Sequence, residues 1–273
     1  MNGELTTAWR TAQLGEVAWV DATGAPQAEV VVPLLDDRLP ALALPYARLA
    51  TARSIAAAGR VTWTLAVPAV AGGAVPVAAA AHVEVIEDPA GERFIATSLL
   101  DQVLAKHPPA RRRLDSVLLR REHGWYVPRL IIRTTELGPS FELGVGEALG
   151  VSTAADGGPW VAAAHQVSVA DGTARLPIDD GPAFVLQHGA DIPDLETPWH
   201  RRWRGTVEAG RFRAIERDEV PLARRPPGLR DRLRTERLRV GRLRAAFEPA
   251  IDMLPNLGIL AVLAIGSWRV STG

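Results

Sequence analysis

One short segment of the chain carries side chains that are typical of phosphate binding. The segment RLATARSIAAAGRVTWTL, which starts at residue 48, contains Arg48, Thr51, Arg53 and Ser54. Guanidinium groups form paired hydrogen bonds with phosphate, and hydroxyl groups supply further donors. Residues three apart are neighbours on a helix, so we interpret this group as a candidate phosphate site. The alternative is a solvated helix face, because 30 of the 31 basic residues are arginines.

A second segment, AKHPPARRR, is strongly basic. It contains Lys106, His107 and residues 111–113, which are all arginine, and it follows the expected end of a helix. Cations at that position compensate the helix dipole without any ligand. An anion site and a simple helix-end cluster are therefore both consistent with the segment.

Two further segments place a histidine beside aromatic side chains. In EHGWYVPR, His123 precedes Trp125 and Tyr126, and in PWHRRWRG, His200 lies among three arginines and two tryptophans. A histidine of either segment, or His107, is a candidate axial ligand of haem, and interleaved arginine and tryptophan stack on planar anions. The alternative is packing at the edge of a core or at an interdomain contact.

Composition excludes several classes of chemistry. The chain of 273 residues has no cysteine, which excludes disulfides, thiolate nucleophiles and iron–sulfur clusters. No spacing of histidines or carboxylates predicts a metal site, and no motif predicts a hydrolase or a dinucleotide fold. The formal net charge is zero, so we expect no nucleic-acid partner. The first residues lack the pattern of a secretory signal, so we expect a cytoplasmic protein.

The order of expected elements predicts an α+β protein that is mainly β. Glycine, proline and aspartate mark turns between runs of β-branched residues, and Gly59 suits the end of a helix. The expected strands and helices of the first half are a strand from residue 15, strands over 27–35 and 39–44, a helix over 48–59, strands over 60–68 and 75–88, helices over 90–107 and 110–124, and a strand over 125–137. Antiparallel strands with helices between them indicate a barrel rather than alternating βα units.

The second half repeats the first faintly. Residues 151–167 resemble residues 17–32 in their strand, glycine turn and strand, which predicts two related barrels in one chain. We expect a split-barrel domain over 1–139, a second, degenerate unit over 140–223, and a C-terminal amphipathic helix with an apolar tail over 224–273. The apolar run LGILAVLAIGSW is shorter than the roughly 20 residues that a membrane span needs, so we expect this helix to dock on protein.

The order of these motifs resembles the pyridoxamine 5′-phosphate oxidase-like family of FMN-binding split β-barrels. The likeness covers roughly residues 8 to 137 well and 146 to 220 weakly, and it includes the turn DATGAP and the helix that ends in Gly59-Arg60-Val61. In this family the helix presents basic and hydroxyl groups to the FMN phosphate. Here Thr51 stands where the family has its phosphate-binding lysine, and Arg48 and Arg53 flank it.

The resemblance implies a flavin (FMN)-dependent oxidoreductase that acts on a small-molecule substrate. It implies that Arg48, Thr51, Arg53 and Ser54 bind the cofactor where the two barrels of one chain meet, as in a pseudo-dimer, and it leaves a further homodimer open. It assigns no catalytic residue. The alternatives are a non-catalytic protein, or a barrel that binds haem or a deazaflavin.

Overall fold

The computed structural model describes residues 3–66, 75–106, 127–189 and 199–221, with side chains up to residue 218. The elements in chain order are α1 (Gly3–Thr11), β1 (Gly15–Val20), β2 (Pro26–Val31), β3 (Leu34–Asp36), β4 (Leu39–Leu44), η1 (Tyr46–Arg48), α2 (Leu49–Ala58), β5 (Arg60–Leu65), β6 (Val77–Asp88), α3 (Glu92–Ala96), α4 (Leu99–Lys106), β7 (Arg129–Glu142), β8 (Ala148–Thr153), β9 (Pro159–Ser168), β10 (Thr173–Arg175), β11 (Gly181–Gly189), β12 (Trp199–Glu208) and β13 (Arg211–Pro221). The described part is therefore mainly β, which confirms the expected α+β class.

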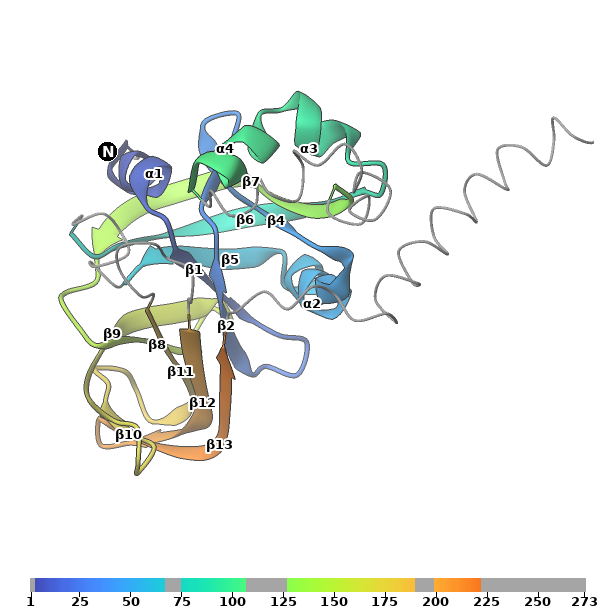
Figure 1. Ribbon diagram of the computed structural model, residues 1–273. Helices are drawn as coiled ribbons and strands as arrows, with labels where there is room; N and C mark the ends of the chain where they lie inside the picture. The colour runs from blue at the N-terminus through green and yellow to red at the C-terminus, as the bar shows by residue number, and fades with distance from the viewer. Residues whose placement is uncertain (1–2, 67–74, 107–126, 190–198, 222–273) are drawn as a thin grey trace, which may run out of the picture. The chain divides into compact units, whose positions relative to one another are not determined.

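The first seven strands form one antiparallel sheet (Figure 1), in the order β2-β1-β5-β6-β7-β4-β3. One face packs against α1 and α2, where Trp9 and Ile55 join Trp63 in a fully buried cluster. The other face carries Ile131 of β7, which packs with Phe94 of α3 and the residues of α4. Because neighbouring residues of a strand point to opposite faces, Leu130 and Ile132 belong to the first cluster.

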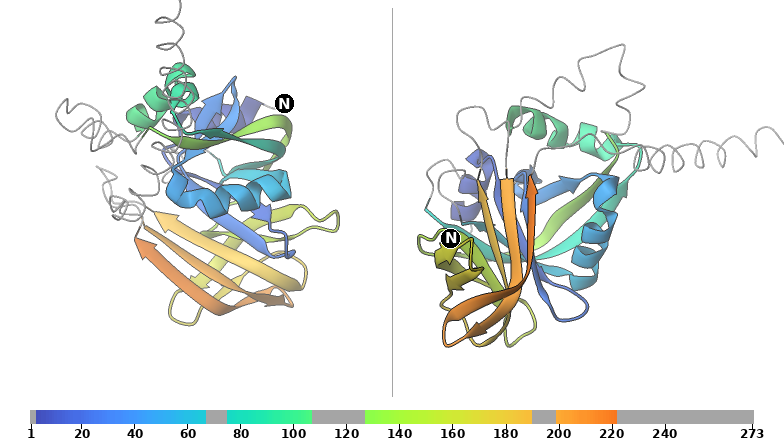
Figure 2. Two further views of the ribbon diagram at one scale, coloured as in Figure 1. Left: turned by 90° about the vertical axis from the view of Figure 1, so that its right-hand side faces the viewer. Right: turned by 60° about the horizontal axis from the view of Figure 1, so that its bottom comes forward.

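The last six strands close into a barrel, in the order β10-β13-β12-β11-β8-β9. Its interior holds alternate apolar residues of each strand, among them Val185, Trp203 and Phe212. The side chains that alternate with them on β11, Phe184 and Leu186, pack instead against the β1–β2 hairpin of the sheet. We call this contact between the sheet and the barrel the seam, and both bodies of strands are visible in Figure 2.

The structure changes two of the expected elements. The expected strand over 27–35 is two strands, β2 and β3, separated by residues 32–33, because Pro33 has no backbone N–H for the ladder. The expected helix over 90–107 is also two, α3 and α4, and Ser98 between them has a φ of 59°. That left-handed conformation ends a helix, so a continuous helix was the wrong prediction.

Other expected elements lie outside the described residues. These are the helix over 110–124 and the C-terminal helix within 224–273. Within the described part, no helix is long and apolar enough to cross a membrane.

Candidate functional site

Helix α2 follows β4 and presents one side to the sheet. Its sequence LATARSIAAA favours a helix because alanine and leucine have high helix propensities. Ala52 and Ile55 are buried, and this fixes the rotation of the helix. Gly59 ends it with a φ of 63°, and the Gly59 N–H donates to the carbonyl oxygen of Ile55 at 3.0 Å. The expected helix over 48–59 is therefore confirmed to within one residue at each end.

The structure brings two of the four expected phosphate-binding residues into contact with the sheet. Ser54 Oγ accepts a hydrogen bond of 2.8 Å from Trp19 Nε1 on β1, and Arg48 forms an ion pair with Glu29 on β2. Thr51 is half-buried between them on the same helix face. Arg53 is exposed, and it makes no hydrogen bond or ion pair with any other residue that the structure describes. Figure 2, left, shows α2 facing the viewer above the barrel strands.

Two arginines of different elements converge on a single carboxylate oxygen at this place. Arg48 Nη2 and Arg202 Nη1 of β12 both contact Oε2 of Glu29, the second at 3.4 Å. Arg202 is held from its other side by Asp218 Oδ2, at 2.6 Å. Burial raises the pKa of the Glu29 carboxyl, and the charges of Arg48 and Arg202 oppose this rise. At the start of α2, the two guanidinium groups therefore already bind one carboxylate in the seam.

Two buried histidines lie beside this arginine pair. His188 of β11 and His200 of β12 are directly opposite in the strand register, so their side chains share one face. His188 Nε2 pairs with Oε1 of Glu16 on β1, whose Oε2 accepts hydrogen bonds from Thr64 Oγ1 at 2.8 Å and from the Ala66 N–H at 3.0 Å. Glu16 and His188 therefore connect the sheet to the barrel inside the seam.

His200, unlike His188, has no hydrogen-bond partner among the residues that the structure describes. It is 2% exposed, and neither of its ring nitrogens has a partner in the described part of the chain. Burial, and then the charges of Arg202 and Arg48, lower the pKa of His200 to about 4. The imidazole is therefore neutral at physiological pH, and one nitrogen is available as an acceptor or as a metal ligand.

Lys106 has a structural explanation that the sequence did not indicate. Its Nζ donates hydrogen bonds of 2.7 Å to the carbonyl oxygens of Trp9 and Pro33, and this connects α4 to α1 and to the segment between β2 and β3. Burial lowers the pKa of Lys106 to about 8. The rest of the AKHPPARRR cluster, and His123 with its two aromatic neighbours, lie outside the described residues.

The sequence predicted the arginine and hydroxyl residues of a candidate site, but the two buried carboxylates near them were not singled out. Glu16 and Glu29 are single carboxylates within apolar strands, GEVAWV and PQAEVV. That pattern is the available signal, because a charged residue in a buried strand requires a partner. The partners themselves are distant, since Arg202 lies 173 positions from Glu29. Over the described residues, no group of three histidines or carboxylates is placed to hold a metal ion.

The comparisons with known proteins concern the fold only. No family model and no curated protein matches the chain. Three solved structures are similar to about half of it. The haem storage protein HutZ of Vibrio cholerae has 12% identity and a TM-score of 0.34, over 51% of this chain and 92% of that one. An F420 reductase has 18% identity and a TM-score of 0.35, over 51% and 96%. A haem-binding protein of Mycobacterium smegmatis has 18% identity and a TM-score of 0.32, over 52% and 57%.

These likenesses are too low to carry an argument about function. The protein has a closed six-stranded barrel beside a seven-stranded sheet, in keeping with the expected split-barrel architecture. Membership of the pyridoxamine 5′-phosphate oxidase-like family, and the internal repeat, stay predictions.

Proposed function

We propose that the protein is a flavin (FMN)-dependent oxidoreductase that binds the FMN phosphate at the seam, beside the start of α2. Arg48, Thr51 and Ser54 form the inner side of this site, and Arg53 approaches the phosphate from the solvent side. The observation that carries the proposal is the convergence of Arg48 and Arg202 on one buried carboxylate oxygen of Glu29. Such a pair of guanidinium groups is suited to a phosphate dianion.

Glu29 is the internal competitor of the phosphate. Its carboxylate now satisfies both arginines, so a phosphate must displace it or share the arginines with it. Because burial raises the pKa of Glu29, its neutral form is more accessible than that of an exposed glutamate. Protonation of Glu29 on binding would release Arg48 and Arg202 to the phosphate. We therefore expect FMN affinity to increase as the charge of Glu29 is removed.

The cofactor supplies the redox chemistry in such a protein, through hydride exchange at N5 of the flavin ring. The role of the chain is to bind the phosphate, to orient the ring and to exclude water at the seam. No side chain is assigned as a catalytic acid or base. The substrate is proposed as a small molecule, and the protein as cytoplasmic.

FMN titration of four variants tests the phosphate site. Arg48→Gln removes one charged donor, so we expect FMN affinity to fall about tenfold or more. Glu29→Gln should raise the affinity, and Arg53→Gln should lower it less than Arg48→Gln does. Arg10→Gln, an exposed arginine on α1, is the matched control and should have no effect. Unchanged affinity in Arg48→Gln would show that the phosphate is not bound there.

Haem binding is the second candidate, and His200 favours it. A neutral imidazole without hydrogen-bond partners is the form that ligates haem iron. Haem titration separates the candidates: a Soret shift that is present in the wild type and in Arg48→Gln, but absent in His200→Ala, would support haem. A protein that takes up neither FMN, nor a deazaflavin, nor haem would be the non-catalytic alternative.

A further inference from the structure

A second cluster of arginines lies on the outer face of the barrel, away from the residues of the seam site. Arg175 of β10 and Arg211 and Arg213 of β13 alternate with the buried residues Ala174 and Phe212. Since successive side chains of a strand point to opposite faces, the three guanidinium groups share the outer surface of the barrel. All three are exposed.

The strand register places the cluster at two levels. At one level Arg175 is directly opposite Arg211, and Glu208 of β12 is opposite Arg211 on the other side. At the next level Arg213 lies between two threonines, Thr173 of β10 and Thr206 of β12. Directly opposed side chains have Cβ atoms about 4.5–5.5 Å apart, and the two levels are separated by about 6.6–6.8 Å.

Among the residues that the structure describes, these three arginines differ from the other arginines of the barrel because they form no ion pair or hydrogen bond. Arg202 pairs with Asp218 at 2.6 Å, and Arg204 pairs with Glu216 at 3.3 Å. In the described ranges, by contrast, Arg175, Arg211 and Arg213 form no ion pair and no hydrogen bond, and Glu208 forms no ion pair with Arg211. Like charges placed directly opposite each other on a sheet are destabilising, so Arg175 and Arg211 repel each other unless an anion lies between them.

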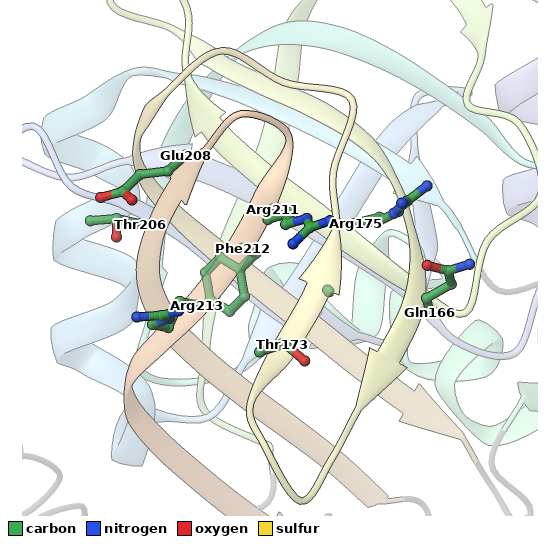
Figure 3. A pocket seen from close by; sticks show the side chains of 9 residues that line it. Gln166, Thr173, Arg175, Thr206, Glu208, Arg211, Phe212 and Arg213 are labelled. Atoms are coloured by element: carbon green, nitrogen blue, oxygen red, sulfur yellow. The ribbon is translucent and has the colours of Figure 1, made fainter.

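The cluster also surrounds a cavity. The cavity has a volume of about 440 Å³, and Gln166 of β9 joins the arginines and both threonines in its lining. Figure 3 shows Arg175 and Arg211 next to each other on neighbouring strands, with Arg213 further along β13. Guanidinium, hydroxyl and amide groups are all hydrogen-bond donors to phosphate oxygens, and a single carboxylate, Glu208, is present. Ala174 and Phe212 complete the lining, so the cavity has an apolar floor, and its donors are those of an anion site.

We propose that this outer face of the barrel binds a small molecule through a diphosphate group. One phosphate lies between Arg175 and Arg211, and the second lies at the level of Arg213, Thr173 and Thr206. The two levels of donors explain why a pair of linked phosphates suits the cluster better than one isolated phosphate. This site is separate from the FMN site and does not depend on it.

Calorimetric titration with inorganic pyrophosphate tests the proposal on the full chain. We expect the wild type to bind pyrophosphate more tightly than orthophosphate at equal ionic strength. The double variant Arg211→Gln with Arg213→Gln should bind it about tenfold more weakly or worse, because two charged donors are removed. Glu208→Gln should bind it more tightly, since the one opposing charge in the cavity is lost. Affinity should fall as sodium chloride is raised.

The controls distinguish this site from the seam. Arg48→Gln and Arg10→Gln should leave pyrophosphate affinity unchanged, and the double variant should unfold at a temperature no lower than the wild type, because it loses the repulsion between Arg175 and Arg211. Loss of binding in Arg48→Gln, with binding retained in the double variant, would place the anion at the seam and overturn the proposal. So would a wild type that does not bind pyrophosphate, or that binds it no more tightly than orthophosphate.

Discussion

At the scale of single residues, the main feature of the seam is a buried imidazole beside two half-buried guanidinium groups. His200 lies within reach of the field of Arg202 and Arg48, and its opposite neighbour His188 is already paired with Glu16. A positive charge on His200 would be shielded from solvent beside these two guanidinium groups. The neutral form of His200 is therefore favoured in the folded chain.

Stability should consequently depend on pH through His200. Its pKa is about 4 in the folded chain and about 6.5 in the unfolded chain, so the unfolded state binds the proton more readily. The free energy of unfolding should be unaffected by this group above pH 6.5, and it should decrease as the pH falls from 6.5 towards 4. The full effect is on the order of 3 kcal/mol.

Urea unfolding between pH 4 and pH 7.5 measures this effect as a difference between variants. In His200→Leu the decrease of the free energy of unfolding towards pH 4 should be smaller than in the wild type. His165→Gln, which changes an exposed histidine of β9, is the control and should keep the wild-type slope. Equal slopes in His200→Leu and the wild type would contradict a depressed His200 pKa.

At the scale of elements, the position of the site depends on where α2 ends. Gly59 adopts a φ of 63°, and a Cβ added there would meet no atom within 4 Å. A substitution at this residue therefore affects only the backbone conformation. The change in conformation would occur at the junction between α2, which carries Ser54 and begins directly after Arg48, and strand β5.

Two substitutions at Gly59 separate backbone strain from packing. Gly59→Ala should lower the free energy of unfolding by about 1 kcal/mol, because alanine disfavours the left-handed region. Gly59→Asn should cost less, since asparagine adopts this conformation more readily. Thermal unfolding of both variants shows which of them loses more stability. A smaller loss in Gly59→Ala than in Gly59→Asn would show that the helix end is not held in this conformation.

Local sequence patterns predicted some helices and strands well and missed features that depend on distant contacts. Helix α2 was predicted to within one residue at each end, and the start of β5 and the end of β6 were predicted to the residue, because alternation, alanine content and Gly59 are local signals. The break between α3 and α4 was not predicted, because it depends on the positive φ of Ser98. Serine has no preference for that conformation that a sequence pattern would reveal. Arg48 and Ser54 were proposed as site residues from helix spacing together with the family resemblance. Glu16 and His188 were not, because their contact joins positions 172 apart, and only the seam brings them together.

At the scale of the whole molecule, the sheet and the barrel are joined by polar contacts of two kinds. Glu16 and His188 are fully buried in the seam, whereas Arg60 and Asp156 form an exposed ion pair of 2.6 Å. A buried pair is strongly destabilising to break, and an exposed pair contributes little. The internal connection between the two bodies should therefore decide whether they unfold together.

Unfolding of Glu16→Gln tests this difference. The variant should lose more than about 2 kcal/mol of unfolding free energy, because the amide has one acceptor oxygen in place of the two carboxyl oxygens that contact three buried groups. Asp156→Asn should unfold at the wild-type denaturant concentration. Tryptophan fluorescence and far-ultraviolet circular dichroism, followed together in urea, measure both. A wild-type transition in Glu16→Gln would show that the seam does not hold the two bodies together.

The same arrangement predicts the stoichiometry of the cofactor. Helix α2 belongs to the sheet, and residues 148–189 and 199–221 of the barrel contain no helix in the described structure. If the chain is a pseudo-dimer of two related units, as we propose, only one unit supplies a phosphate helix. The saturated protein should bind one FMN per chain. A ratio of two, measured by absorbance after gel filtration, would contradict a single site.

The central claim is that the seam recognises the phosphate of a flavin, and one comparison tests it most directly. FMN and riboflavin share the flavin ring and differ in the phosphate, so the ratio of their dissociation constants isolates the phosphate contribution. Flavin fluorescence titration should give FMN a clear advantage over riboflavin in the wild type. This advantage should be reduced about tenfold or more in Arg48→Gln, with riboflavin affinity unchanged. Equal binding of FMN and riboflavin by the wild type, or binding of neither, would contradict the account.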